Sequence, residues 1–195
     1  MPGLDHFEQN AAMHQVTTYR DISDQDHDAV IALFNATFTA SEGADEGAAI
    51  AAFVTRMLAD TPAPDWCAHV AHQGNTLVAA VVFSRLSYSQ DPRSVFILSP
   101  MAVAPDHQGQ GIGQALIRHG LADLRQCGVD VAVTYGDPAF YTRVGFQTVD
   151  TAMVPAPLAL SQPQGWLAQD LGAGVLTPLR GEAACVAALN SPDLW

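Results

Sequence analysis

The chain has 195 residues, of which 49% are hydrophobic, and its formal net charge is −12 at pH 7. A chain of this length forms one domain, or one domain with an appended piece, and can bury a substantial core. The negative charge argues against nucleic acid or an anionic membrane as a partner. It suits a cationic or amine substrate, although many soluble proteins are acidic. All eight basic residues are arginines, so no phosphate-binding loop of the Gly-Lys-Ser/Thr kind can form.

Neither a membrane span nor a secretion signal is evident in the sequence. No apolar run is long enough to cross a bilayer, and Met1–His6 has neither a basic nor an apolar signal region. Cys67, Cys127 and Cys185 are odd in number and widely separated, unlike a disulfide framework or a zinc knuckle. We therefore expect a cytoplasmic protein without a metal.

The N-terminal part of the chain predicts one strand and two helices. Residues 1–15 are polar and aperiodic, and we expect them to be frayed. Residues 16–20 predict a first strand, after which Ser23 or Asp24 can cap a helix. The apolar positions of this helix recur at helical spacing, at Val30, Leu33, Phe34, Thr37 and Phe38. A second helix, roughly 45–59, has one apolar face, made by Ile50, Phe53, Val54, Met57 and Leu58.

A hairpin is predicted next. Residues 66–72 and 76–84 have strand character and are joined by a turn at 73–75. The second of these strands is apolar on both faces, which is typical of a central strand. His69 and His72 lie three residues apart on the first strand and point to opposite faces, so we expect no metal site from this pair.

The middle of the chain alternates strand and helix. Residues 87–93 predict a polar loop, and the apolar runs 96–103 and 129–135 predict a fourth and a fifth strand. The amphipathic helix between these two strands carries four apolar residues, Leu116, Ile117, Leu121 and Leu124. Two of its glycines allow a close approach to a sheet, Gly113 and Gly120.

A glycine loop leads into this helix, with the sequence Gln108-Gly109-Gln110-Gly111-Ile112-Gly113. A dinucleotide-binding fingerprint would place its third glycine at the position of Gln114. As a plain strand-to-helix turn, three alternating glycines would be costly, at roughly 1 kcal/mol each inside a helix. The third interpretation is a pyrophosphate cradle, in which backbone N–H groups and the helix dipole hold phosphate oxygens.

This loop resembles the Gln/Arg-x-x-Gly-x-Gly/Ala acyl-CoA loop of the GCN5-related N-acetyltransferases, the GNAT superfamily. Two further segments match the superfamily's neighbouring motifs in order and spacing, Met101-Ala102-Val103-Ala104-Pro105 and Phe140-Tyr141-Thr142-Arg143-Val144-Gly145-Phe146. The form Gly136-Asp137-Pro138-Ala139-Phe140-Tyr141, with the strand expected behind it, resembles the YhbS-like branch in particular. Many members have an asparagine where this chain has Gly136-Asp137, so no role of that asparagine can be carried over.

The resemblance implies an α/β (α+β) fold with a mixed, mostly antiparallel central sheet flanked by helices. In this fold the fourth and fifth strands splay apart. After a flexible segment at 1–15, residues 16–150 would form the N-acetyltransferase domain. Residues 151–195 would be a C-terminal extension packing on the same domain, with short strands at 166–171 and 174–177.

By the same resemblance, acetyl-CoA is the cosubstrate, no metal is needed, and the pantetheine arm lies between the splayed strands. Met101 and Val103 would offer main-chain hydrogen bonds to the arm, and a backbone N–H there would polarise the thioester carbonyl. Residues 108–114 would hold the pyrophosphate. The residues expected to contact the cofactor are Met101, Ala102, Val103, Gln108, Gly109, Gln110, Gly111, Ile112, Gly113 and Gln114.

Tyr141 matches the tyrosine that similar enzymes place near the CoA sulfur as the general acid. A phenol suits this task because it stays protonated at neutral pH. The alternative is a core aromatic that packs against CoA. An attacking alkylamine must also lose a proton. Asp137, His107 and Tyr135 lie near the right loops, but the sequence does not identify the base.

The sequence therefore predicts an acyl-CoA-dependent N-acyltransferase that transfers acetyl from acetyl-CoA to a primary amine by direct attack. The alternative is a non-catalytic acyl-CoA-binding or regulatory domain, and a dinucleotide-binding oxidoreductase is a distant third. We expect a small-molecule or peptide amine as the acceptor, with no nucleic-acid or membrane partner. The sequence does not determine the oligomeric state, and a homodimer is possible.

Overall fold

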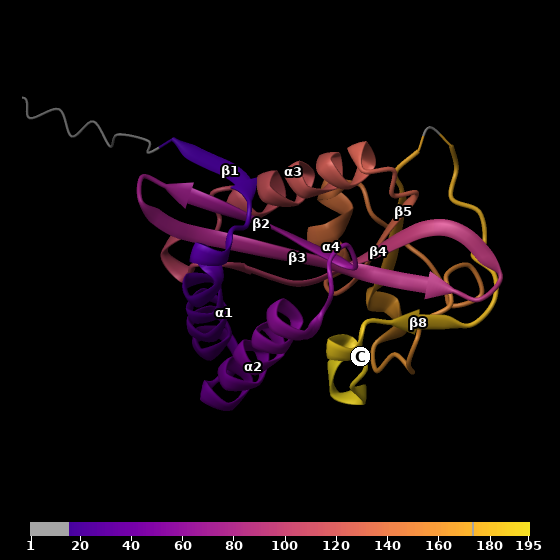
Figure 1. Cartoon of the computed structure of the whole chain (residues 1–195), viewed down its shortest axis with the longest axis horizontal. Coiled ribbons are helices and arrows are strands. Elements are labelled where there is room, and N and C mark those ends of the chain that lie inside the picture. The colour runs from indigo at the N-terminus through magenta and orange to yellow at the C-terminus, as the bar shows by residue number, and fades with distance from the viewer. Residues whose placement is uncertain (1–15, 173) are drawn as a thin grey trace, which may run out of the picture.

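The computed structural model of the chain describes residues 16–172 and 174–195, and it forms a mixed sheet covered by helices (Figure 1). The segment 1–15, which we expected to be frayed, lies outside the described residues. Within them, eight strands form the sheet in the order β1-β2-β3-β4-β5-β7-β6, with β8 paired to β3. The strands are β1 (Thr17–Asp21), β2 (Trp66–Gln73), β3 (Thr76–Tyr88), β4 (Asp91–Val103), β5 (Val131–Tyr135), β6 (Gln147–Thr148), β7 (Trp166–Asp170) and β8 (Ala183–Cys185).

Helices cover both faces of this sheet. On one face lie α1 (His27–Glu42) and α2 (Ala44–Asp60), on the other lies α3 (Ile112–Gln126), and the short α4 (Pro138–Tyr141) follows β5 (Figure 1). The apolar positions predicted for the first two helices are buried in the core, at Val30, Leu33, Phe34, Ile50, Phe53, Val54, Met57 and Leu58. The fold class and these helices are therefore confirmed.

The strand β3 lies between the two helical layers. Ala80 and Val82 belong to the apolar cluster with α1 and α2, whereas Val81 and Phe83 belong to the cluster with α3. All four are fully buried. Alternate side chains of a strand point to opposite faces, so a strand that is apolar on both faces has to be covered on both. The predicted central strand is confirmed.

The strands β4 and β5 run parallel but stay together only briefly. Residues 95–98 of β4 pair with residues 131–134 of β5. Beyond that point β4 continues to Val103, and among the described strands its partner there is β3. The predicted splay of the fourth and fifth strands is confirmed.

A β-bulge in β4 coincides with the separation. Val81 and Phe83 of β3 pair with Met101 and Leu98 of β4, so two residues of β4 lie opposite a single residue of β3. The second of the two is Pro100. Because proline has no N–H to donate to a ladder, it favours a bulge. The proline thus marks the position where β4 leaves β5.

The prediction of a polar loop at 87–93 is wrong. Here β3 and β4 form a tight hairpin with residues 89–90 as the turn. Arg93 donates to both carboxylate oxygens of Asp91 (2.8 and 2.7 Å) and to the carbonyl of Pro178 (2.7 Å). The hydrogen bonds from Arg93 hold the pKa of the Asp91 carboxyl well below its usual value. The polar residues of this segment predicted a loop because a partner such as Pro178 lies far away in the sequence.

The strand predicted at 166–171 is confirmed as β7, whereas the one predicted at 174–177 is wrong. The strand that forms nearby is β8, which pairs with residues 86–88 of β3. The carbonyl of Thr177 accepts a hydrogen bond from the side chain of Arg93 (3.0 Å) and so has a partner outside a sheet ladder. An extended apolar segment does not by itself specify its pairing.

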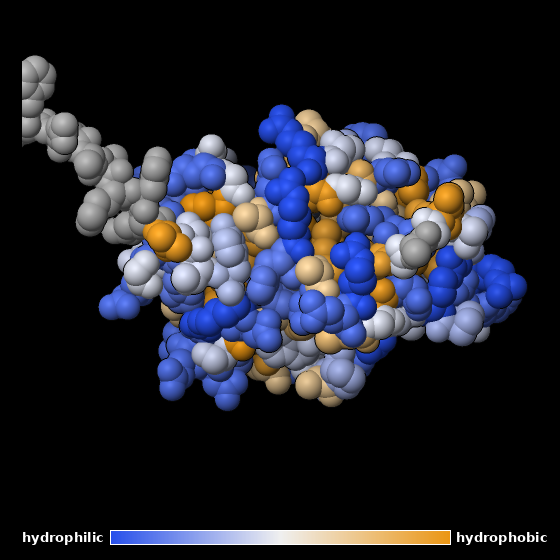
Figure 2. All heavy atoms as spheres, turned by 90° about the horizontal axis from the view of Figure 1, so that it is seen from above, coloured by the Kyte–Doolittle hydropathy of each residue, from blue (hydrophilic) through white to orange (hydrophobic). Residues whose placement is uncertain are grey.

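The surface on the α3 side of the molecule is largely hydrophilic. Figure 2 shows this face, on which apolar side chains form small separate patches among polar ones. In the part of the chain that the structure describes, no helix combines the length and the apolar character that a membrane crossing requires.

The C-terminal segment packs on the core through Trp195. Its ring centroid lies 5.9 Å from that of Trp166 and 6.4 Å from that of Tyr135. Its indole N–H donates to the carbonyl of Leu189 (2.9 Å), and only 5% of the residue is exposed. A buried tryptophan with a satisfied N–H contributes a large apolar area and favourable aromatic pairs.

We predict that Trp195→Ala lowers the free energy of unfolding by about 3–5 kcal/mol, the usual cost of truncating a buried aromatic residue. Urea unfolding monitored by circular dichroism measures this. The control is Val175→Ala, because Val175 is 86% exposed in the same segment; its effect should stay within about 0.5 kcal/mol. Equal losses in the two variants would contradict the packing described for Trp195.

Candidate active site

A cleft of about 570 Å³ opens where β4 and β5 separate. It is lined by the C-terminal part of α1, residues 101–103 of β4, the glycine loop with the first turn of α3, and residues from the segment 136–143. All the residues expected to contact the cofactor line this cleft except Gln110, and Tyr141 lines it too. The structure thus brings together residues that the sequence placed in three separate motifs.

The end of β4 directs backbone polar groups into the cleft. The N–H of Ala104 donates to the carbonyl of Val78 in β3 (2.8 Å). Along an antiparallel strand, residues that bond to the partner strand alternate with residues that face away from it. The backbone groups of Ala102 therefore face β3, and those of Met101 and Val103 face the side from which β5 has separated.

The glycine loop forms an open turn at the start of α3. Gly109 and Gly111 have φ values of 73° and 79°, in the left-handed region that favours glycine, and no atom lies within 4 Å of where a Cβ would be. The first helical bond joins the N–H of Ala115 to the carbonyl of Gly111 (3.0 Å). The N–H groups of residues 112–114 have no acceptor inside the helix and are available to an anion in the cleft.

Gly113 lies where α3 packs closely on side chains of β4. A Cβ at this position would collide with Cε of Met101 and would lie 3.1 Å from Cγ2 of Val103. The predicted close approach of this glycine is therefore confirmed. The loop is also tied to β4 by Gln108, whose side-chain amide donates to the carbonyl of Val103 (3.0 Å).

The ring of Tyr141 lines the cleft. It packs edge-on against Phe140 (5.1 Å between centroids) and Phe146 (5.9 Å). A Cβ on Gly136 would lie only 2.7 Å from Cε2 of Tyr141, so glycine is needed there. Burial raises the pKa of the Tyr141 phenol above its ordinary value, and the Thr134 hydroxyl partly offsets this rise.

The three residues considered as a base have different surroundings. Asp137 lines the cleft, and its carboxylate accepts the N–H of Ala139 (2.9 Å), so this side chain caps α4. His107 lines the cleft with its Nδ1 buried and, among the described residues, without a hydrogen-bond partner. Tyr135 lies in a neighbouring hollow instead. Glu42, at the end of α1, is an acidic residue of the cleft that the sequence did not single out.

Two further residues of the cleft were missed from the sequence. Thr37 was assigned to the buried face of its helix, yet it lines the cleft, and its Oγ1 is buried without a hydrogen-bond partner among the described residues. Arg143 brings a positive charge to the cleft, and its carbonyl accepts a hydrogen bond from Arg118 of α3 (2.8 Å). Arg143 lies within the motif at 140–146, but its place in the cleft depends on the fold.

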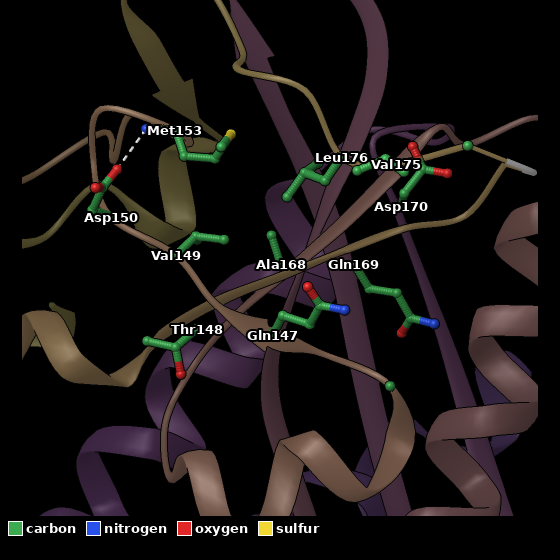
Figure 3. Close-up of a pocket in the computed structure, with 12 residues that line it drawn as sticks. Gln147, Thr148, Val149, Asp150, Met153, Ala168, Gln169, Asp170, Val175 and Leu176 are labelled. Carbon is green, nitrogen blue, oxygen red and sulfur yellow. Dashed lines mark hydrogen bonds between the residues drawn. The ribbon is translucent and has the colours of Figure 1, made fainter.

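The larger of the other hollows among the described residues differ in their relation to this cleft. One, of about 600 Å³, is at the β6–β7 edge, where Figure 3 shows Gln147, Gln169 and Leu176 around it; it contains none of the predicted site residues. The other, of about 480 Å³, shares Gly136 and Asp137 with the cleft and reaches toward the C-terminal segment. The second hollow therefore extends the cleft, and the first does not.

Comparison with known proteins assigns this fold and its motifs to one class. Residues 64–148 match the acetyltransferase (GNAT) domain. The chain is 31% identical over 137 residues to YjhQ of Escherichia coli K12, described as an uncharacterized N-acetyltransferase. The aligned residues make up 68% of this chain and 75% of YjhQ. It is 34% identical over 71 residues to YhbS of the same organism, also described as an uncharacterized N-acetyltransferase, covering 36% of this chain and 42% of YhbS.

Solved structures have the same fold. YhbS from E. coli in complex with CoA superposes with a TM-score of 0.77 at 23% identity, covering 90% of this chain and 92% of that one. A GNAT family acetyltransferase from Brucella melitensis in complex with acetyl-CoA gives a TM-score of 0.71 at 24% identity, covering 91% and 100%. The chain belongs to the GNAT family of N-acetyltransferases, and its resemblance to the YhbS-like branch is confirmed.

We predict that the Tyr141 phenol ionises at a higher pH than an ordinary tyrosine, because burial disfavours its phenolate. The measurement is the phenolate absorbance of the wild type minus that of Tyr141→Phe during an alkaline titration. Near pH 10, where about half of an exposed tyrosine is ionised, less than half of the difference signal should have developed. A difference signal already half complete below this pH would contradict the buried position of the phenol.

Proposed function

We propose that this protein transfers the acetyl group of acetyl-CoA to a primary amine by direct attack of the amine on the thioester carbon. The observation that carries the proposal is the junction of an open β4 edge with a glycine turn at the start of a long helix. At such a junction the backbone groups of β4 can bind the amides of the pantetheine arm, and the N–H groups at the start of α3 can bind phosphates. The CoA-bound and acetyl-CoA-bound neighbours support this choice of cosubstrate.

The residues of the cleft fit the pyrophosphate of CoA. The open space beside Gly109 and Gly111 lets phosphate oxygens approach the backbone closely. The first turn of α3, residues 112–115, carries no charged side chain, so the positive end of the helix dipole is uncompensated there. Arg143, which also lines the cleft, adds a cation.

The residues of β4 fit the pantetheine arm. Met101 and Val103 would pair with its amides, as a neighbouring strand would. Gln108 already donates to the Val103 carbonyl, which indicates that this acceptor is accessible from the cleft. A backbone N–H in this row would polarise the thioester carbonyl as negative charge develops on its oxygen.

Tyr141 would act as the general acid. When the amine attacks, the bond between the acyl carbon and sulfur breaks, and the departing thiolate needs a proton. A buried phenol with a raised pKa holds its proton at neutral pH and can supply it. The amine must lose a proton as well, and the acidic side chains that line the cleft are those of Glu42 and Asp137.

The acceptor would enter from the side of the C-terminal segment. We propose that residues 16–150 form the catalytic domain and that residues 151–195 pack on it and border the acceptor space. The hollow that extends the cleft supports this, because it is lined by Asp137 together with Asp193 and Trp195. The cytoplasmic location expected from the cysteine pattern stays a prediction.

We predict that Tyr141→Phe lowers kcat for acetyl transfer by roughly 10²–10⁴-fold, the usual contribution of general acid catalysis. The KM for acetyl-CoA should stay within about twofold, since the ring remains as a packing surface. The assay follows release of the CoA thiol with a panel of small amines and peptides.

The matched control is Tyr88→Phe. Tyr88 is a buried tyrosine whose hydroxyl donates to the carbonyl of Pro155 (2.9 Å) outside the cleft, so kcat should be unchanged. An unchanged kcat in Tyr141→Phe would remove the acid role from Tyr141. A wild-type protein that binds acetyl-CoA but releases no thiol above the amine-free rate would contradict the proposed transfer.

A further inference from the structure

Outside the cleft, the structure brings three side chains that can bind metal together between the sheet and α3. Asp21 ends β1, His69 lies in β2, and His119 lies in the middle of α3. One ligand atom from each of the three lies within 4.8 Å of the other two. None of the three lines the active-site cleft.

His69 is enclosed by this group, with a side chain that is 1% exposed. Its Nδ1 lies 3.0 Å from Oδ1 of Asp21, and its Nε2 lies 3.8 Å from Oδ2 of Asp123. The Nε2 atom is buried and has no hydrogen-bond partner among the described residues. The ring of His119 stands edge-on to it, with 5.3 Å between centroids.

This geometry leaves a buried nitrogen lone pair without a partner. A neutral imidazole carries one N–H, so when Nε2 holds it and points toward Asp123 the Nδ1 atom is an acceptor only. Nδ1 then faces the carboxylate of Asp21, another acceptor. A cation between the two groups removes the conflict.

We propose that Asp21, His69 through its Nδ1 atom, and His119 bind a divalent transition-metal ion, best matched by Zn²⁺, and that Asp123 orients the His69 ring from the Nε2 side. Imidazole nitrogens combined with carboxylate oxygens suit Zn²⁺, whereas Ca²⁺ and Mg²⁺ prefer oxygen ligands throughout. The side chains of Asp21 and Asp123 are 76% and 37% exposed, which gives the ion a route from solvent.

The proposed ion would join three elements that are far apart in the sequence, β1, β2 and α3. The ion would take no part in acetyl transfer. It would lie beside the middle of α3, away from the glycine loop at the start of this helix. His69 and His72, the pair that we expected not to form a metal site, do point to opposite faces. His72 lies beside Asp26 on the α1 side (4.0 Å), and His119 of α3 takes its place in the site.

The test is a Zn²⁺ titration of the full chain after metal removal, by competition with a chromophoric chelator and by thermal unfolding. The wild type should bind one equivalent of Zn²⁺ and unfold at a higher temperature with the ion present. His119→Ala and Asp21→Asn should each weaken binding at least tenfold and lose the thermal shift. Both changes are at sites that solvent reaches, so the fold should survive them.

The matched control is His27→Ala. His27 also lies near an aspartate, with Nε2 4.0 Å from Oδ1 of Asp24, but it has no place in the three-residue group. Its loss should leave the affinity for Zn²⁺ unchanged. Absence of saturable binding by the wild type would overturn the proposal. So would an unchanged affinity in His119→Ala, which is the result expected if the ion binds His6 or His14 instead.

Discussion

The separation of β4 from β5 is the constraint on which the site depends. Backbone groups inside a sheet are normally paired, so a strand that loses a neighbour offers its N–H and C=O groups to another molecule. The bulge before Met101 coincides with the end of the β4–β5 pairing. Gly113 lies where the start of α3 packs on the exposed part of β4, and Tyr141 lines the same cleft. The cleft, the proposed cradle and the proposed acid all follow from this one change in pairing.

The local electric field at the glycine loop outweighs the overall negative charge of the chain. The chain carries a net charge of −12, which by itself would repel a phosphorylated cosubstrate. Salt screens exposed charges beyond roughly 10 Å, whereas the helix dipole acts within its first turn. The uncharged start of α3 and the nearby Arg143 therefore determine what binds at the glycine loop. The acidic residues Glu42 and Asp137 lie in the same cleft, where a cationic amine would approach.

Local patterns predicted the elements well, and long-range contacts explain what they missed. Periodicity and glycine spacing predicted the first two helices, the central strand and the close approach of Gly113. The hairpin at 89–90 was missed because Arg93 finds its partners near Pro178, 85 residues later. The group around His69 could not be predicted either, because one partner ends β1 and another lies in α3. Residue types reveal such clusters only once the topology is known.

The measurement that tests the central claim most directly is a thermal unfolding scan with acetyl-CoA, free CoA and NADH. Ligand at about a hundred times its dissociation constant adds roughly 2.7 kcal/mol to the free energy of unfolding. For a chain of this size the midpoint should rise by roughly 5–10 °C. The account predicts this rise with both CoA compounds and none with NADH. No rise with either CoA compound would contradict it and would reduce the glycine loop to a turn.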